Sequence, residues 1–446
     1  MSASPPAQLP ITNYQLPLLA QALRSGQLPV TNYLDILERR FDLIEPSLQA
    51  FMPEPGRFDR LRAQAAELVQ RWPAPDTRPA LFGLPVGVKD IMRVDGLPTT
   101  GGSRLPAILF EAPESACVTQ LKEAGALIAG KTVSTEFAYF GPGPTRNPHN
   151  LAHTPGGSSS GSAAAVAAGL CPLALGTQTV GSVIRPAAFC GVVGFKPSHN
   201  RITTAGVIPL SISVDHVGLF AADVAGVALA ARVLVRDWRP DRPSRRPVLG
   251  LPEGPYLAQA SEEGLRAFRA TVESLRRRGY RVMRVPAMDD FEAVREHHEA
   301  IVAADAAAFH AEWYGRYHDL YHPRTVALIE QGRTISADRL AEALAGRGKL
   351  RAELLALMDE NGVDLWLAPS ARGPAPLGLE STGDPVMNLP WTHSGLPAIS
   401  LPAGAVDGLP LGLQVVGRWQ ADERLLAWAE TLEPELAAAA TETGAP

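Results

Sequence analysis

A run of glycines and serines that turns abruptly into helix formers limits most strongly what this chain can fold into. Residues 156–162 read Gly-Gly-Ser-Ser-Ser-Gly-Ser, and residues 163–169 continue as Ala-Ala-Ala-Val-Ala-Ala-Gly. Glycine lets a backbone pass through a crowded place, and serine caps helix N-termini. A flexible linker of the same residues would need no apolar helix behind it. The order therefore predicts a closely packed loop that opens a helix.

Two further segments stand out on either side of this loop. Downstream, residues 176–186 read Gly-Thr-Gln-Thr-Val-Gly-Ser-Val-Ile-Arg-Pro, which is too specific a pattern for a linker. Upstream, Lys89 interrupts the apolar run Leu-Pro-Val-Gly-Val-Lys-Asp over residues 84–90. We expect the three segments to meet in space, and the functional interpretation depends on that meeting.

Apolar periodicity along the chain alternates between strand-like and helix-like segments. Short apolar runs over residues 126–129 and 192–195 indicate buried strands, whereas residues 114–124 and 223–234 indicate helices. Such alternation favours an α/β fold with a mixed, mostly parallel twisted sheet that is covered by helices on both faces.

Residues 236–246 are rich in arginine, proline and aspartate and form the best candidate for a surface linker. Beyond them the pattern predicts a strand over 280–285 and a long helical region over 290–361. Further strands are predicted over 363–369, 398–402 and 411–416. Because short strands on both sides of the linker can share one sheet, we expect a single large domain over residues 1–446.

Composition excludes several classes of function. The 446 residues include 41 basic and 46 acidic side chains, and a net charge of −5 argues against a nucleic-acid surface. Three cysteines cannot build a disulfide framework and fit a reducing compartment. Neither a secretory signal nor an apolar run of membrane-spanning length is found. We therefore expect a cytoplasmic protein without nucleic-acid or membrane partners.

Lys89 and the serines each have a structural and a chemical interpretation. Within an apolar strand, Lys89 is either paired with Asp90 or kept neutral by desolvation, and a neutral amine is a general base. Ser182 follows Gly181 in a turn, where its hydroxyl is exposed and backbone N–H groups can hold an oxyanion. Ser158 alone reads as a helix cap. Taken one by one, the residues leave both interpretations open.

Together, the three segments resemble the amidase signature family, serine hydrolases that use a Ser–cis-Ser–Lys triad. Residues 156–169 match the family's glycine/serine motif, residues 176–191 match its nucleophile motif, and Lys89 matches its strand lysine. Further similarity covers residues 141–147, 383–392 and 408–417. The likeness is strongest over about residues 80–235, the expected signature core, and returns over 363–430. It implies the amidase signature fold, a single large α/β/α domain.

The resemblance implies a role for each matched residue. Ser182 is expected to be the nucleophile that forms an acyl-enzyme, Ser158 the proton relay and Lys89 the neutral base. The Gly157–Ser158 peptide is expected to be cis. The oxyanion hole is expected to consist of four backbone N–H groups, those of Thr179, Val180, Gly181 and Ser182. This chemistry needs no metal and no cofactor.

Four positions depart from the family's pattern. Arg185 falls one place later than in many members, and Ser160 stands where glycine is frequent. Val180 stands where glycine or alanine is common, and Gln178 stands where aspartate is frequent. A β-branched residue restricts the backbone, so Val180 is expected to stiffen the loop and narrow the pocket.

By the same resemblance, the substrates are amides, with carbamates or esters as side substrates. Four residues are expected to line the pocket: Phe140, Gln178, Trp391 and Thr392. The helical region over 290–361 is expected to cover it with aromatic side chains, and the alternative is that these aromatics are core. We expect a small, uncharged, partly aromatic or alkyl amide or a urethane-like carbamate as substrate.

Two other functions stay open. One is an amidotransferase A-type subunit that generates ammonia for a tRNA-bound partner. The other is a non-catalytic binding protein on the same scaffold, an idea that rests on Val180 alone. A homodimer is a further expectation. His318 and His322 have the spacing of metal ligands on a helix, but exposed or packing histidines are the preferred interpretation.

Overall fold

One sheet takes its strands from both halves of the chain. The computed structural model describes residues 15–442, and its 10-stranded sheet has the order β2-β1-β3-β5-β4-β9-β10-β8-β6-β7. The strands are β1 (Pro85–Lys89), β2 (Leu127–Thr132), β3 (Leu173–Gln178), β4 (Val193–Lys196), β5 (His216–Ala221), β6 (Leu249–Glu253), β7 (Val282–Pro286), β8 (Leu365–Pro369), β9 (Ala398–Val406) and β10 (Leu409–Val416).

Strand direction divides the sheet into three parts. At one end β2, β1 and β3 run parallel, at the other end β8, β6 and β7 run parallel, and all neighbours between β3 and β8 are antiparallel. Part of the antiparallel centre comes from a tight hairpin between β9 and β10. Its two turn residues, Asp407 and Gly408, both have positive φ, as a type I′ turn requires. The expected mixed sheet is confirmed, with its parallel pairs in the outer parts.

The segment over 236–246 does not divide the sheet. Strand β8 pairs with β10 on one side and with β6 on the other, so strands before and after this segment are hydrogen-bonded into the same sheet. Residues 1–14 and 443–446 of the expected single domain lie outside the described residues.

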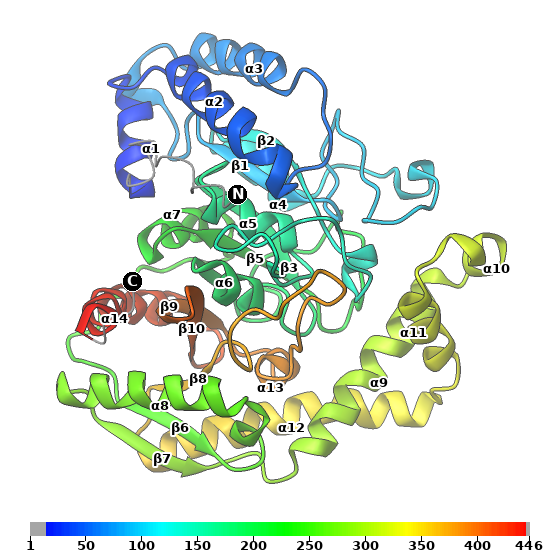
Figure 1. Ribbon diagram of the computed structural model, residues 1–446, viewed down its shortest axis with the longest axis vertical. Coiled ribbons are helices and arrows are strands. Elements are labelled where there is room, and N and C mark those ends of the chain that lie inside the picture. Colours follow the sequence, from blue (N-terminus) through cyan, green and yellow to red (C-terminus); the bar gives the residue numbers. More distant parts are fainter. Residues whose placement is uncertain (1–14, 443–446) are drawn as a thin grey trace, which may run out of the picture.

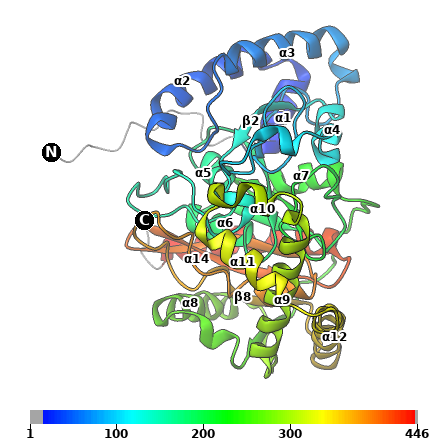
Figure 2. The ribbon, with the colours of Figure 1, turned by 90° about the vertical axis from the view of Figure 1, so that its right-hand side faces the viewer.

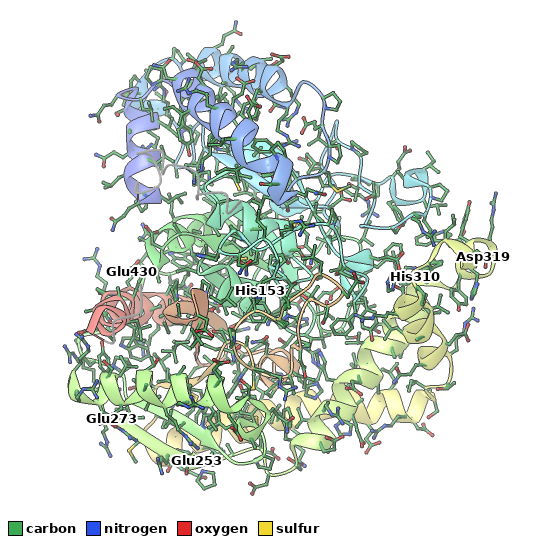
Figure 3. All side chains as sticks on the ribbon, in the orientation of Figure 1. His153, Glu253, Glu273, His310, Asp319 and Glu430 are labelled. Atoms are coloured by element: carbon green, nitrogen blue, oxygen red, sulfur yellow. The ribbon has the colours of Figure 1, made fainter. Side chains whose placement is uncertain are left out.

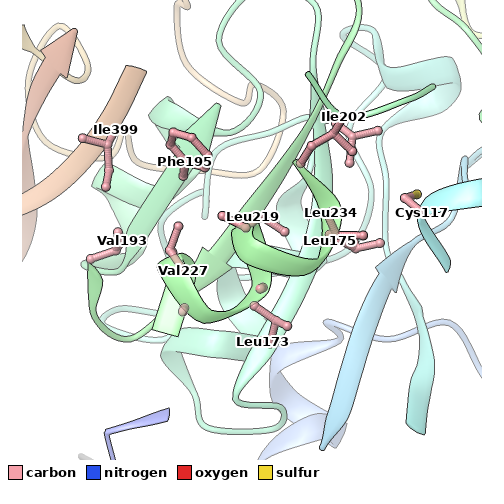
Figure 4. Packing of buried hydrophobic residues seen from close by; sticks show 14 of the residues in the cluster. Cys117, Leu173, Leu175, Val193, Phe195, Ile202, Leu219, Val227, Leu234 and Ile399 are labelled. Carbon is pink, nitrogen blue, oxygen red and sulfur yellow. The ribbon is translucent and has the colours of Figure 1, made fainter. Parts of the chain in front are cut away.

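Helices cover both faces of the sheet (Figure 1). Alternate strand residues point to opposite faces: Leu173, Leu175 and Leu219 pack on one side with α7, as Figure 4 shows, whereas Ala174 and Phe220 pack on the other side with α5. The helices of the sheet body are α1 (Leu16–Ser25), α2 (Val30–Leu48), α3 (Arg57–Arg71), α4 (Ala116–Glu123), α5 (Ser160–Ala167), α6 (Ile184–Cys190), α7 (Val224–Leu234), α8 (Glu262–Arg277), α13 (Leu389–His393) and α14 (Asp422–Glu442).

The region expected to be helical over 290–361 forms an extension that we call the helical arm. It consists of α9 (Phe291–His310), α10 (Tyr314–Tyr317), α11 (Pro323–Arg333) and α12 (Ala337–Asn361). Helix α9 packs against α11, α12 and α13. Figure 1 places α10 at the outer end of the arm, where Asp319 is labelled in Figure 3, and in Figure 2 the arm faces the viewer.

Within residues 15–442, no helix combines the length and apolar character that crossing a bilayer requires.

Candidate active site

The three segments singled out in the sequence meet at the carboxyl ends of β1 and β3. These strands are parallel neighbours, with Val86 opposite Leu173 and Val88 opposite Leu175. Lys89, the last residue of β1, therefore lies beside the end of β3, from which the segment carrying Ser182 departs. Helix α5, which follows the glycine/serine loop, contacts both strands. The expected meeting is confirmed.

Lys89 is fully buried and bonded to two hydroxyl groups. Its Nζ lies 2.6 Å from Ser158 Oγ and 2.8 Å from Thr177 Oγ1, and the side chain is 0% exposed. Burial lowers the pKa of Lys89 well below its usual value, because an ammonium group loses its hydration there. The residue is thereby held toward the neutral amine, which can accept a proton.

Two buried charged residues act on Lys89 in opposite directions. The negative charge of Asp215 raises the pKa of Lys89, and the positive charge of Arg185 lowers it, although burial is the largest effect. The Asp215 carboxylate accepts hydrogen bonds from Thr179 Oγ1 at 2.5 Å and from the backbone N–H groups of Leu210 and Ser211. Burial raises the pKa of Asp215 to about 6.

The hydroxyls of the glycine/serine loop explain its composition. Ser159 Oγ donates to the carbonyl of Thr177 and accepts from its N–H, both at 3.2 Å. Ser162 Oγ donates to Leu175 O at 2.8 Å. Gly161 has no room for a side chain, because a Cβ would lie 2.1 Å from the carbonyl oxygen of Ala50. The serines thus bond the loop to β3, and the glycine permits the close approach that this needs.

The Gly157–Ser158 peptide bond is cis, as expected. Arg185 holds the carbonyl of this peptide: its Nη2 donates to Gly157 O at 2.6 Å, and its Nη1 donates to Gly383 O at 2.9 Å. Burial lowers the pKa of Arg185 to about 10. An arginine on α6 therefore fixes the loop that presents Ser158 to Lys89.

Residues 179–182, which we call the Ser182 loop, join β3 to the segment before α6. Two of its carbonyls accept hydrogen bonds from neighbouring residues. Val180 O accepts from Thr392 Oγ1 at 2.6 Å, and Gly181 O accepts from Arg185 N at 3.0 Å. In contrast, none of the four N–H groups of the loop donates a hydrogen bond to any residue within 15–442. Free, adjacent N–H groups of this kind can bind an oxyanion.

Ser182 is the most accessible of the three expected catalytic side chains. It is 7% exposed, compared with 2% for Ser158 and 0% for Lys89. Among the hydrogen bonds of the described residues, none joins the Ser158 and Ser182 hydroxyls. Contacts between catalytic groups are often longer before substrate binds. The structure therefore contains the contact between Lys89 and Ser158, and we expect the contact between Ser158 and Ser182 to form when substrate binds.

Three of the four residues expected to line the pocket are fully buried. Gln178, Trp391 and Thr392 are all 0% exposed. Gln178 Oε1 accepts from the N–H groups of Val183 and Ile184 at 2.8 and 3.0 Å, and its Nε2 donates to Thr392 Oγ1 at 3.0 Å. Gln178 and Thr392 are therefore bonded to the backbone around Ser182, and the lining of a substrate pocket by these three residues stays a prediction.

Trp391 belongs to the core behind α13, and Phe140 lies at the helical arm. The indole Nε1 of Trp391 donates to Tyr256 Oη at 2.7 Å. Phe140 is partly exposed, its ring packs against Tyr139, and its carbonyl accepts from Arg324 of α11 at 3.1 Å. Phe140 is thus the one member of the expected set that is open to a bound molecule.

Aromatic residues of the arm pack against a segment that adjoins Ser158. Phe137 contacts His310, which Figure 3 labels, and Tyr321, with ring centroids 4.5 and 5.8 Å apart. Two residues earlier, the N–H of Thr135 donates to Ser158 O at 3.2 Å. Because Tyr321 and Tyr314 are each only 3% exposed, these aromatics form a core that joins the arm to the Ser158 loop.

Comparisons with known proteins show the family of this chain. A family model described as Amidase matches residues 37–426. This chain belongs to the amidase signature family. It is 34% identical to the A-type subunit of the glutamyl-tRNA(Gln) amidotransferase from Thermus thermophilus, over 90% of this chain and 93% of that protein.

Solved structures of two amidases have the same fold. A crystal structure of an amidase superposes with a TM-score of 0.85 and 30% identity, covering 95% of this chain and all of that one. The native peptide amidase from Stenotrophomonas maltophilia superposes with a TM-score of 0.77 and 25% identity, covering 96% and 98% of the two chains. The amidase signature fold expected from the sequence is confirmed.

Sequence reasoning missed the polar residues Asp215 and Asn388 at this site. Asp215 precedes β5, and its only sequence signal is a carboxylate directly before an apolar strand. Asn388 donates to Ser370 O at 2.9 Å, and its Oδ1 would lie 2.2 Å from a Cβ on Gly181. That contact, which the sequence does not reveal, explains why the residue before Ser182 is glycine.

The bonds of Gln178 lead to a stability prediction. Gln178→Ala leaves two buried N–H groups at the start of α6 without an acceptor, so we expect the free energy of unfolding to fall by about 2–4 kcal/mol. Gln178→Glu keeps an acceptor for both groups and loses only the donor to Thr392, so its loss is expected to be smaller. Urea unfolding of the three proteins measures the difference. Equal stabilities of the wild type and Gln178→Ala contradict this account of the loop.

Proposed function

We propose that this chain is a serine hydrolase that cleaves the C–N bond of amides through an acyl-enzyme on Ser182. Ser158 relays protons, and Lys89 is the base. The observation that carries the proposal is the 2.6 Å contact between a fully buried lysine amine and Ser158. Beside it, the N–H groups of the Ser182 loop donate to no residue within 15–442. Membership of the amidase signature family supports it.

The proposed reaction begins with neutral Lys89. Its Nζ accepts the Ser158 proton, and Ser158 takes the proton of Ser182 as that oxygen attacks the carbonyl carbon of the substrate. The N–H groups of the Ser182 loop stabilise the oxyanion that forms. The C–N bond then breaks as Ser158 returns a proton to the leaving nitrogen. Water hydrolyses the acyl-enzyme by the same route in reverse, which regenerates all three groups.

The charged side chains beside the Ser158 and Ser182 loops favour an uncharged substrate. The two charged side chains bonded to these loops, Asp215 and Arg185, are buried and bonded to protein groups. Neither is placed to pair with a charged group on a substrate. We therefore propose an aryl or alkyl amide or a urethane-like carbamate, with Phe140 and the helical arm covering the pocket.

A second candidate function comes from the relatives. The A-type subunits of glutamyl-tRNA(Gln) amidotransferases from a Roseiflexus species and from Thermus thermophilus are 32% and 34% identical to this chain. If this chain has the same role, it should release little ammonia from amides on its own and should co-purify with partner proteins in a pull-down.

Covalent labelling tests the proposed nucleophile and base. We expect a fluorophosphonate probe to label the wild type and not Ser182→Ala, and Lys89→Ala to be labelled at least about 100-fold more slowly, because a general base contributes roughly that much. Lys349→Ala, which changes an exposed lysine of α12, should react as the wild type does. Persistent labelling of Ser182→Ala overturns the proposal. A wild type that takes up no probe also overturns it, because a non-catalytic binding protein would behave in that way.

A substrate panel tests the proposed substrate class. Anilides, carbamates, small primary amides and glutamine are offered separately to the isolated chain, and product amine or ammonia is measured. We expect turnover of anilides or carbamates, because the charges of Asp215 and Arg185 beside the loops are already bonded to protein groups. Turnover of glutamine alone, or of malonamide alone, contradicts this substrate class and favours the amidotransferase interpretation or another branch of the family.

The pH dependence of kcat/KM tests the charges around Lys89. Activity should fall as the pH drops through the pKa of Lys89, because the protonated amine accepts nothing. Asp215→Asn removes a charge that raises this pKa, so the acid limb should move to lower pH; Arg185→Gln removes one that lowers it, so the limb should move to higher pH.

Arg185→Lys is the matched control, since it keeps the positive charge and should leave the limb close to its wild-type position. The variants are needed because burial raises the pKa of Asp215 itself to about 6, so that its own titration also contributes to the acid side of the profile. Shifts of the same sign in Asp215→Asn and Arg185→Gln contradict the assignment of the limb to Lys89.

A further inference from the structure

One carbonyl of the Ser182 loop is held by the helical arm. Besides Val180 O and Gly181 O, the carbonyl of Thr179 is bonded: His298 Nε2 lies 3.0 Å from it. His298 stands on α9 and is 1% exposed. A carbonyl oxygen can only accept, so Nε2 carries the hydrogen and donates it. The contact reaches from residue 298 to a loop more than a hundred residues earlier in the chain.

This contact sets the direction of an N–H group that faces the other way. The carbonyl of Thr179 and the N–H of Val180 belong to the same peptide unit, which is trans. In a trans peptide the C=O and N–H bonds point in opposite directions. Fixing the carbonyl toward His298 therefore fixes the Val180 N–H on the opposite side of the loop, and that N–H has no partner among residues 15–442.

A second histidine, His393, fixes the tautomer of His298. His298 Nδ1 lies 3.4 Å from His393 Nδ1 of α13, and the two rings meet edge to face. Since Nε2 of neutral His298 carries the hydrogen, its Nδ1 has the lone pair, and His393 Nδ1 must donate. Only one tautomer of each ring satisfies both contacts.

Both rings stay neutral over the pH range in which enzymes work. Burial lowers the pKa of His298 to about 3 and that of His393 to about 2. The positive charge of Arg347, whose Nε donates to His393 O at 3.1 Å, acts in the same direction. A single tautomer, and hence a steady donor to Thr179 O, is therefore maintained.

We propose that His298, held in one tautomer by His393, is a positioning residue that aims the Val180 N–H at the oxyanion. This inference rests on the proposed function of Ser182 and adds that the helical arm, through α9, takes part in the reaction. His298 touches no substrate; it acts through the Thr179–Val180 peptide.

Two substitutions of similar polarity separate positioning from mere packing. In His298→Gln the side-chain amide can place its N–H where Nε2 stands, whereas in His298→Asn the amide is too short to reach Thr179 O. We expect kcat for an activated ester to fall by about 10-fold or more in His298→Asn, a fraction of the loss for a deleted oxyanion donor. KM should change little, and His298→Gln should stay within about threefold of the wild type.

A thionoester of the same alcohol makes the readout specific for the oxyanion hole. A sulfur anion is larger and a weaker hydrogen-bond acceptor, so the ratio of ester to thionoester turnover reports how well the hole fits oxygen. This ratio should fall in His298→Asn and recover in His298→Gln. His393→Leu, which keeps His298 but frees its Nδ1, should lower the ratio by a smaller amount.

His310→Leu is the matched control: it removes another buried histidine of α9 that does not contact the Ser182 loop. Its ratio should equal that of the wild type. An unchanged ratio in both His298→Asn and His393→Leu, or an equal fall in His310→Leu, overturns the inference. A wild type that hydrolyses neither ester and takes up no fluorophosphonate contradicts the proposed function instead, so the two failures are distinguishable.

Discussion

The site depends on keeping one lysine amine away from water. An ammonium group without hydration is costly, so burial favours the neutral amine, and two hydroxyls within hydrogen-bond distance of Lys89 Nζ keep that amine bonded. The charge of Arg185 acts in the same direction as burial, and the charge of Asp215 opposes it. The arrangement lets the amine be neutral without leaving it unbonded. Every other feature of the site, from the glycine/serine loop to the Ser182 loop, positions groups relative to that nitrogen.

The sheet makes this arrangement possible by bringing distant segments to one edge. The parallel pair β1 and β3 places Lys89 and Thr177 side by side although they are 88 positions apart. Loops at the carboxyl ends of adjacent parallel strands are where α/β proteins gather their functional groups. The helical arm contacts the same edge of the sheet at two places. Its Tyr321 packs against Phe137 beside the Ser158 loop, and its His298 bonds to the Ser182 loop.

Much of this could be predicted from the sequence because the signals are local. The Gly-Ser-Ala run predicts the loop before α5, and apolar runs predict most of the strands. The meeting of Lys89 with the Ser158 loop follows from family resemblance. What could not be predicted depends on contacts between distant residues. The hydrogen bonds that join Gln178 to Thr392, and Thr392 to Val180, connect segments that are far apart in the sequence, so the pattern did not reveal them. Likewise, nothing near His298 in the sequence shows that its partner is Thr179.

The central claim is that Lys89 is a neutral amine in the resting protein, and side-chain NMR tests it most directly. Protein labelled with ¹⁵N and ¹³C at lysine is titrated from about pH 6 to pH 10, and the Lys89 signal is assigned by its loss in Lys89→Met. The account predicts the chemical shift of an uncharged amine at neutral pH, with protonation only at lower pH, as its buried position requires. A Lys89 signal that stays that of an ammonium group up to about pH 10, as in an ordinary lysine, contradicts it.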